Sequence, residues 1–157
     1  MPTRDLMPPD EQARILAEHA RAPRKKGLLP DVRHIGTRDL DGFSVLKMQV
    51  LMNDQTFTDV RWDGTGTKVF VASASILASW LSGKTIEDYN KLLELWEKML
   101  AQVEVVEQAP FLGEVRALEY VIRNRPDRVR EIQLAWTAVA QLIQGRAGVR
   151  APSAAAA

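Results

Sequence analysis

Two runs of alternating residues, separated by a short polar turn, most constrain the fold of this chain. The first run, GFSVLKMQVLMND (42–54), places four apolar residues on one face: Leu46, Met48, Val50 and Met52. Because successive side chains of a strand point to opposite faces, this pattern predicts a strand with one buried face. The run 56–62 is typical of the return strand, and Asn53-Asp54 can form the turn. A third strand is predicted over VRHIGT (32–37), so we expect a small antiparallel sheet of about three strands.

Helical periodicity appears on both sides of these strands. Apolar residues at intervals of three and four predict helices over 11–22, 69–82, 86–103, 111–122 and 125–143. Asp10 is the expected N-cap of the first helix, and Gly83 is expected to end the second. Thr85 and Asp88 form a capping-box pattern before the third. A helix, a small sheet and then several helices predict an α+β fold, with helices packed on one face of the sheet.

The length of 157 residues suits a single domain, which we expect over residues 10–145. Residues 1–9 are predicted to be a flexible leader, and the alanine-rich residues 146–157 a disordered tail. The apolar stripes of the helices predict a common core that includes Leu77, Trp80, Leu93, Trp96, Leu118, Trp136 and Ile143.

Charge and composition narrow the possible functions. The formal net charge of +1 gives no electrostatic reason to expect nucleic acid or a membrane surface as a partner. The chain has no cysteine, which excludes disulfides, thiol nucleophiles and thiolate-bound metal centres. No apolar run approaches the length of a membrane span, and the first residues lack the apolar core of a signal peptide. We therefore expect a cytoplasmic protein.

Chemistry alone identifies no convincing catalytic group. The glycine-containing turn 64–66 precedes a helix, but it lacks the pattern of a phosphate-binding loop, and a structural turn is the favoured interpretation. His19 and His34 are too few to predict a metal site, and His19 is expected on a helix surface or in packing. Ser73 and Ser75 have no histidine that the sequence places beside them.

Five segments, in order, resemble a known family. They are EHARAPRKKG (18–27), DVRWDGTGTKVFVASAS (59–75), SGKTIED (82–88), FLGEVRALEYV (111–121) and RPDRVREIQLAW (125–136). Together they resemble the U-type iron–sulfur cluster assembly scaffolds, SufU, IscU and the N-terminal domain of NifU, and are closest to the SufU branch. The resemblance covers about residues 10–143. It implies the SufU/IscU-like α+β fold.

The resemblance also locates the positions that hold metal in the family, which uses three cysteines and one aspartate. The first cysteine position corresponds to Gly42, the aspartate to Ser44, the second cysteine to Thr67 and the third to Glu131. These ligands are absent from this chain. Thr67 is expected to cap the helix that follows it. Glu131 is expected to lie near Thr67 and Ser44 and to pair with Arg128, three residues before it.

The favoured hypothesis is a scaffold homologue that lacks the cluster and zinc ligands and works by binding proteins. We expect no catalysis, no cofactor and no bound metal. The resemblance implies partners such as a cysteine desulfurase, an iron–sulfur acceptor protein or a larger complex, with no role for nucleic acid or membrane. The basic turn Arg24, Lys25 and Lys26 is a candidate partner-binding surface.

Two alternatives stay open. The chain could be a metal-binding scaffold with substitute ligands, for which Glu131, His34 and Asp39 or Asp41 are the candidates. It could also be an enzyme on a recycled fold, with a pocket around Thr67 and Glu131. Convergence of these side chains in space would favour one of the alternatives, whereas an ion pair between Glu131 and an arginine would favour the protein-binding hypothesis.

Overall fold

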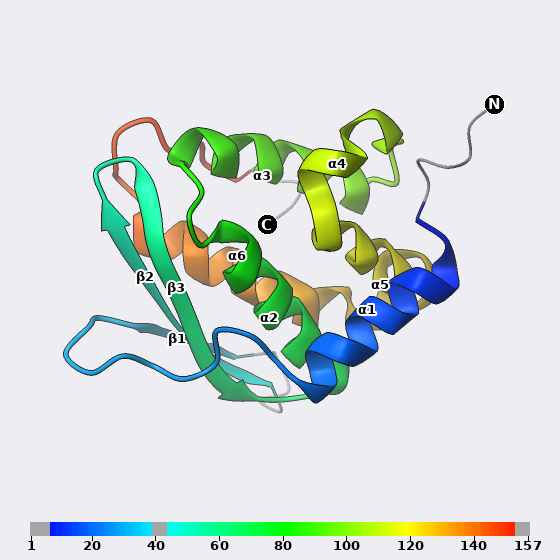
Figure 1. Cartoon of the computed structure of the whole chain (residues 1–157), viewed down its shortest axis with the longest axis horizontal. Helices are drawn as coiled ribbons and strands as arrows, with labels where there is room; N and C mark the ends of the chain where they lie inside the picture. The colour runs from blue at the N-terminus through cyan, green and yellow to red at the C-terminus, as the bar shows by residue number, and fades with distance from the viewer. Residues whose placement is uncertain (1–6, 39–43, 153–157) are drawn as a thin grey trace.

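The computed structural model describes residues 7–38 and 44–152 of the chain (Figure 1). The strands are β1 (Ile35–Arg38), β2 (Val45–Asn53) and β3 (Thr56–Thr65). The helices are α1 (Pro9–Arg21), α2 (Lys68–Leu81), α3 (Ile86–Leu100), α4 (Ala109–Leu112), α5 (Glu119–Asn124) and α6 (Val129–Ile143). Short 3-10 turns η2 (Val106–Gln108), η3 (Gly113–Leu118) and η4 (Pro126–Arg128) connect the later helices.

The strands form an antiparallel sheet in the order β1-β2-β3, as the alternating pattern predicts. The β2–β3 turn lies one residue later than predicted. Asn53 still pairs with Thr56, so the turn residues are Asp54 and Gln55. Asp54 has a φ of 57°, a left-handed conformation that aspartate adopts more readily than most residues. Strand β3 also continues to Thr65, past its predicted end at Trp62.

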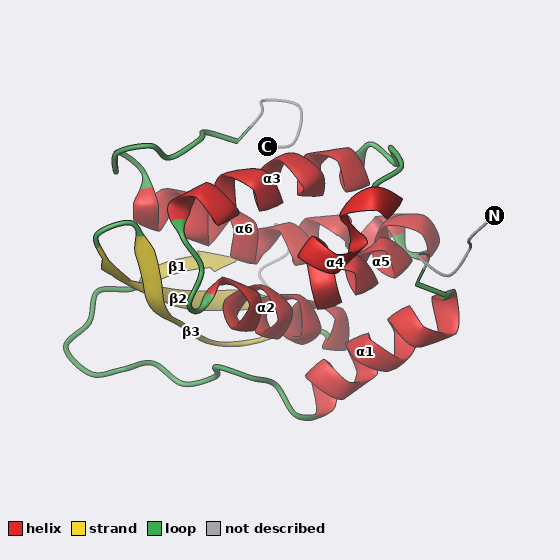
Figure 2. Ribbon diagram, turned by 45° about the horizontal axis from the view of Figure 1, so that its top comes forward, coloured by secondary structure: helices red, strands yellow, loops and turns green. Residues whose placement is uncertain are grey.

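The helices cover one face of the sheet, where α2 and α6 pack against the strands and α1 packs on α2 (Figures 1 and 2). The covered face is apolar, because the side chains of Leu46, Met48 and Trp62 are fully buried beneath the helices. The α+β architecture is therefore confirmed. Among the described residues, no helix is long and apolar enough to cross a membrane.

The predicted core is confirmed, since six of its seven residues are buried: Leu77, Leu93, Trp96, Leu118, Trp136 and Ile143. Trp80, the seventh, is partly buried and packs against this core. Its indole nitrogen donates to the Phe111 carbonyl at 3.1 Å, and the Lys84 ammonium lies 4.8 Å from its ring centre. Trp80 therefore sits at the edge of the core, where its polar atom and one ring face have surface partners.

Several helix predictions need correction. The third helix ends at Leu100 rather than at residue 103, and the last begins at Val129 rather than at residue 125. Asp10 is not the N-cap of α1, because the helix begins two residues earlier than predicted, at Pro9, and Asp10 lies in its first turn. Proline suits this first helical position, since its missing N–H would have no helical partner there. The segment 111–122 is not one helix but parts of α4, η3 and α5. Gly113, with a φ of +54°, ends α4.

The segment after α6 differs from the disordered tail that the sequence predicts from residue 146. Asn90 donates to the carbonyl of Gly148 at 2.7 Å and accepts from the amide of Arg150 at 2.8 Å. Arg150 also forms an ion pair with Glu97 at 2.7 Å. Residues 146–152 are thus attached to α3. Residues 1–6 of the predicted leader and 153–157 of the predicted tail lie outside the described residues.

Candidate functional site

The predicted glycine turn is the end of β3, where Gly64 lies within the strand and Gly66 just after it, and both glycines lie unusually close to the start of β2. A Cβ atom added to Gly64 would lie 2.1 Å from the carbonyl oxygen of Val45, and Gly64 has a φ of +152°. A Cβ atom on Gly66 would lie 2.6 Å from both the Phe70 ring and the Ser44 hydroxyl. At Gly64 the contact is with backbone and leaves no room for a side chain, whereas at Gly66 the neighbouring side chains would have to move. The glycines are therefore needed to pack this turn, which leads directly into α2.

Thr67 follows the turn and has two partners. Its hydroxyl oxygen accepts from the backbone amide of Phe70 at 3.2 Å, so Thr67 is the N-cap of α2, as the sequence predicts. The same hydroxyl donates to Oε1 of Glu131. The glycine turn thus holds a hydroxyl in contact with a carboxylate from a helix that lies 64 residues later in the chain.

Glu131 is the centre of this group of side chains. Its side chain is only 5% exposed, in the first turn of α6. Its Oε2 accepts from Arg128 Nη1 at 2.7 Å, which confirms the predicted ion pair. This hydrogen bond is the main reason that the pKa of Arg128 lies above its usual value. The buried Ser44 hydroxyl lies 3.5 Å from Oε1, at the long limit for a hydrogen bond.

Three of the four positions that the resemblance singled out therefore lie together: Ser44, Thr67 and Glu131. The fourth, Gly42, is outside the described residues. Such a convergence was predicted from the family alone, since nothing in local periodicity brings these residues together. The partner of Glu131 could be found from the sequence, because Arg128 is one helical turn before it.

These side chains do not fit an iron–sulfur cluster or a zinc ion. The set offers one carboxylate, already paired with a guanidinium, and two neutral hydroxyls. Zinc and iron–sulfur centres require thiolates, imidazoles or several carboxylates. Among residues 7–38 and 44–152, no three histidine, aspartate or glutamate side chains are grouped so that they could hold a metal ion.

Of the proposed substitute ligands, His34 lies within the described residues, and it is not brought together with Glu131. His34 is exposed and precedes β1, whose Ile35 pairs with Met48. Met48 is four residues from Ser44 along β2, about 13 Å in an extended strand. His34 therefore lies just beyond the Ile35–Met48 pair, away from the end of β2 that is next to Ser44. The other candidates, Asp39 and Asp41, lie outside the described residues.

A second polar group was missed by the sequence. Ser75 Oγ lies 2.6 Å from His19 Nδ1, and His19 Nε2 lies 2.9 Å from Glu114. The sequence places no histidine beside Ser75, but the fold does, because α1 packs across α2 and joins residues 56 positions apart. Ser75 and His19 are both almost fully buried, and Ser75 Oγ also accepts the Arg24 amide at 2.7 Å. This chain of hydrogen bonds joins α1 to α2, and its serine is inaccessible as a nucleophile.

The basic turn has local partners. Arg24 Nη1 lies 3.1 Å from Glu114, and Lys25 forms an ion pair with Asp59 at 2.9 Å. Lys26 is exposed and lies 5.5 Å from the centre of the Trp62 ring. Of the three predicted partner-binding residues, Lys26 is thus the one that contacts an aromatic ring instead of a carboxylate within the described part of the chain, so its charge is the least neutralised.

Comparison with known proteins gives consistent matches over most of the chain. The sequence profile of the NifU-like N terminal domain matches residues 11–114. The Bacillus subtilis zinc-dependent sulfurtransferase SufU is 24% identical over 80% of this chain and 84% of its own length. The Streptococcus pyogenes iron–sulfur cluster assembly scaffold protein IscU is 25% identical over 87% of this chain and 84% of its own.

Solved structures show the same fold. The N-terminal part of a nitrogen-fixing NifU-like protein from Brucella abortus superposes with a TM-score of 0.68, covering 87% of this chain and 95% of that one, at 19% identity. A putative iron–sulfur cluster assembly scaffold protein for the SUF system from Fervidobacterium islandicum has a TM-score of 0.67, covering 80% and 90%, also at 19% identity.

Proposed function

Since the chain belongs to the NifU-like N-terminal domain family of iron–sulfur cluster assembly scaffolds, we propose that it is a scaffold-shaped accessory protein that binds proteins and holds no cluster or zinc. The proposal is supported above all by Glu131. This residue stands at a cysteine position of the family, yet its carboxylate is buried and paired with Arg128 at 2.7 Å. A carboxylate with that partner is stable without a metal ion.

The chemistry of sulfur transfer also argues against an enzyme. The Bacillus subtilis relative is named a zinc-dependent sulfurtransferase. A protein that accepts sulfur as a persulfide needs a thiolate, and this chain contains no cysteine. Neither Thr67 nor Ser44 can replace it, because a persulfide is a sulfur–sulfur bond and a hydroxyl offers only oxygen. We therefore propose a non-catalytic role in the cytoplasm.

A cysteine desulfurase is the partner that the family resemblance favours, followed by an iron–sulfur acceptor protein or a larger complex. Lys26 supports a contact on the basic turn, because its exposed ammonium is available to a carboxylate of a partner. Arg24 and Lys25 would contribute less, since each already faces a carboxylate of its own chain.

Metal binding tests the first part of the proposal. The protein is reconstituted anaerobically with iron and sulfide, and zinc is titrated by calorimetry, with Bacillus subtilis SufU as the positive control. We expect neither a stoichiometric cluster nor zinc binding in the micromolar range. Zinc binding that is lost in Glu131→Ala would contradict the proposal and support a site with substitute ligands.

Partner binding tests the second part. The purified chain is immobilised, and the cysteine desulfurase of the same organism is passed over it at several salt concentrations. We expect a salt-dependent complex that Lys26→Glu weakens. The matched control is Lys98→Glu, which reverses an exposed lysine on α3 that pairs only loosely with Glu94, at 3.7 Å. Equal binding by both variants would exclude the basic turn, and no binding by the wild type would exclude this partner.

A further inference from the structure

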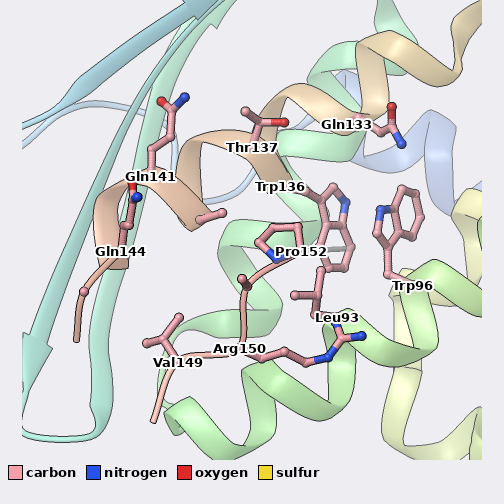
Figure 3. A pocket seen from close by; sticks show the side chains of 13 residues that line it. Leu93, Trp96, Gln133, Trp136, Thr137, Gln141, Gln144, Val149, Arg150 and Pro152 are labelled. Carbon is pink, nitrogen blue, oxygen red and sulfur yellow. The ribbon is translucent and has the colours of Figure 1, made fainter. Parts of the chain in front are cut away.

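The helical layer contains two aromatic pairs that differ in exposure. The indoles of Trp96 and Trp136 are stacked, with ring centres 4.5 Å apart, and both are buried (Figure 3). Trp80, on α2, and Phe111, on α4, form the second pair, with ring centres 5.2 Å apart and an angle of 70° between their planes. Both rings of this second pair are only partly buried, so it lies at the surface of the molecule.

Each ring of the exposed pair carries a lysine over its face. The Lys84 ammonium lies 4.8 Å from the centre of the Trp80 ring, and the Lys91 ammonium, on α3, lies 4.4 Å from the centre of the Phe111 ring. A chain of three contacts, each 5.2 Å or shorter, therefore runs from one ammonium through both rings to the other. We call these four side chains the aromatic–lysine patch; they join α2, α3 and α4, which lie side by side in Figure 2.

Backbone contacts hold the patch in place. The indole nitrogen of Trp80 donates to the Phe111 carbonyl at 3.1 Å. The link around Lys84 is joined to β3, because the Gly83 amide donates to the Phe57 carbonyl and the Phe57 amide donates to the Lys84 carbonyl, both at 2.7 Å. A surface that is ordered before binding loses less entropy when a partner binds, so this patch is suited to recognition.

The two lysines have no acidic partner in the part of the chain that the structure describes. Their ammonium groups face rings, whereas Lys98, further along α3, lies 3.7 Å from Glu94. An ammonium has three N–H donors, and a ring face attracts its charge without supplying an oxygen acceptor. The patch therefore offers two positive charges beside two partly exposed rings, which suits a partner that combines carboxylates with an apolar side chain.

The neighbouring charges favour a protein segment over a nucleic acid or an anionic membrane. Glu87 and Glu94 are exposed on α3, one helical turn before and one helical turn after Lys91. A uniformly anionic partner would meet these carboxylates as well as the lysines, and like charges repel. A peptide can place its carboxylates at the two ammonium groups alone.

We propose that the aromatic–lysine patch binds an acidic segment of a partner protein, with an aromatic side chain of that segment against Trp80 and Phe111 and carboxylates on Lys84 and Lys91. Tryptophan is among the residues that most often carry the binding energy of protein interfaces. Six extended residues span about 20 Å, which is enough to reach both lysines. The inference rests on the proposed function, because it takes the partner to be a protein, and it adds a second contact surface to the basic turn.

Two-dimensional NMR of the isotope-labelled full chain tests the inference. The probe is the peptide Gly-Asp-Glu-Phe-Glu-Asp-Gly with blocked ends, and the chain has four tryptophan indole signals to follow. We expect a saturable shift of the Trp80 signal, while those of the buried Trp96 and Trp136 stay in place. A control peptide with Asn and Gln in place of the acids keeps the length and the ring, and should bind about tenfold more weakly.

Charge reversal separates the patch from a general effect of charge. Lys91→Glu should weaken binding of the acidic peptide about fivefold, whereas Lys98→Glu on the same helix should leave it near wild type. A peptide with Lys in place of the acids should bind Lys91→Glu more tightly than the wild type, a gain that a folding defect would not produce.

The inference and the proposed function can fail separately. No saturable shift of Trp80 at millimolar peptide, or equal affinity of Lys91→Glu and Lys98→Glu, would overturn the inference. Equal binding of oligothymidylate at the same signals would show a general anion site and would also overturn it. In each of these cases, a desulfurase complex that Lys26→Glu weakens would still support the proposed function.

Discussion

Gly66 lacks a side chain at a position where both the Phe70 ring and the Ser44 hydroxyl approach the backbone closely. An added Cβ atom would lie 2.6 Å from both the Phe70 ring and the Ser44 hydroxyl. We expect Gly66→Ala to lower the free energy of unfolding by about 1–3 kcal/mol, as overpacking typically does. Urea denaturation measures this. Gly36→Ala is the matched control, since its added Cβ would make only an ordinary contact, 3.9 Å from the Leu46 carbonyl oxygen.

Thr67 acts through its hydroxyl, which both caps α2 and contacts Glu131. Thr67→Val keeps the shape of the side chain but removes the oxygen, and should cost about 1–2 kcal/mol of unfolding free energy. Thr67→Ser keeps the oxygen and should remain close to wild type. The difference between the two variants in chemical denaturation isolates the hydroxyl, and equal midpoints would show that the cap is not needed.

The cap of Thr67 and the Arg128–Glu131 pair could be predicted because each depends on residues three positions apart in the sequence. The contact between Thr67 and Glu131 spans 64 residues, and only the resemblance to a family of known architecture indicated it. The contact between His19 and Ser75 spans 56 residues, and the apolar periodicity does not predict it. Local spacing thus predicts caps and helical pairs, whereas the packing of distant elements decides which polar groups meet.

At the scale of elements, hydrogen bonds of Ser75, on α2, connect this helix to α1 and to the residues that follow α1. Its hydroxyl accepts the Arg24 amide at 2.7 Å and can donate to His19 Nδ1, which lies 2.6 Å away. Ser75→Ala would leave both groups without this partner in a buried place, so we expect a loss of about 1–3 kcal/mol in unfolding free energy. Amide hydrogen exchange should also become faster in α1.

Ser79 provides the comparison for this prediction. It lies on the same helix, but its hydroxyl donates only to the Ile76 carbonyl in the preceding turn, at 3.2 Å. Ser79→Ala should therefore leave both the urea midpoint and the exchange of α1 near wild type. If Ser75→Ala behaved like Ser79→Ala, the contact between α1 and α2 would rest on apolar packing alone.

Elements with a regular pattern were easier to predict than those with a break. The capping box of α3 is present as expected, with Thr85 and Asp88 bonded reciprocally. The segment after α3 has helical spacing but is divided by Gly113, whose positive φ turns the chain. The start of α1 was shifted by Pro9. Gly113 divides an apolar periodicity that continues past it, whereas Pro9 extends α1 beyond the N-cap that Asp10 predicts.

At the scale of the whole molecule, the α+β class follows from the change of apolar period from two to about three and a half at the glycine turn. The contacts that residues 146–152 make with α3 cannot be predicted from the spacing of apolar residues in the sequence. Arg150 reaches Glu97, and Asn90 bonds the backbone of the segment, although the composition of the segment is typical of disorder. A few specific polar contacts attach a segment that has little apolar surface to bury.

Tyr89, which is buried on α3 beside Phe57, makes the free energy of unfolding depend on pH in the alkaline range. Burial raises the pKa of Tyr89 from 10.0 to about 12, an effect that the nearby charge of Arg150 partly offsets. The folded state therefore holds the phenolic proton more tightly than the unfolded state. The contribution of this proton to the free energy of unfolding is fully present below pH 10 and is lost as the pH rises toward 12. The loss is about 2–3 kcal/mol.

Between these pH values, we expect the free energy of unfolding of the wild type to fall by about 2–3 kcal/mol more than that of Tyr89→Phe. Urea denaturation at a series of pH values measures both proteins, and the comparison removes the common effect of the titrating lysines. Parallel curves for the two proteins would show that the phenol of Tyr89 ionises in the folded state as easily as in the unfolded chain.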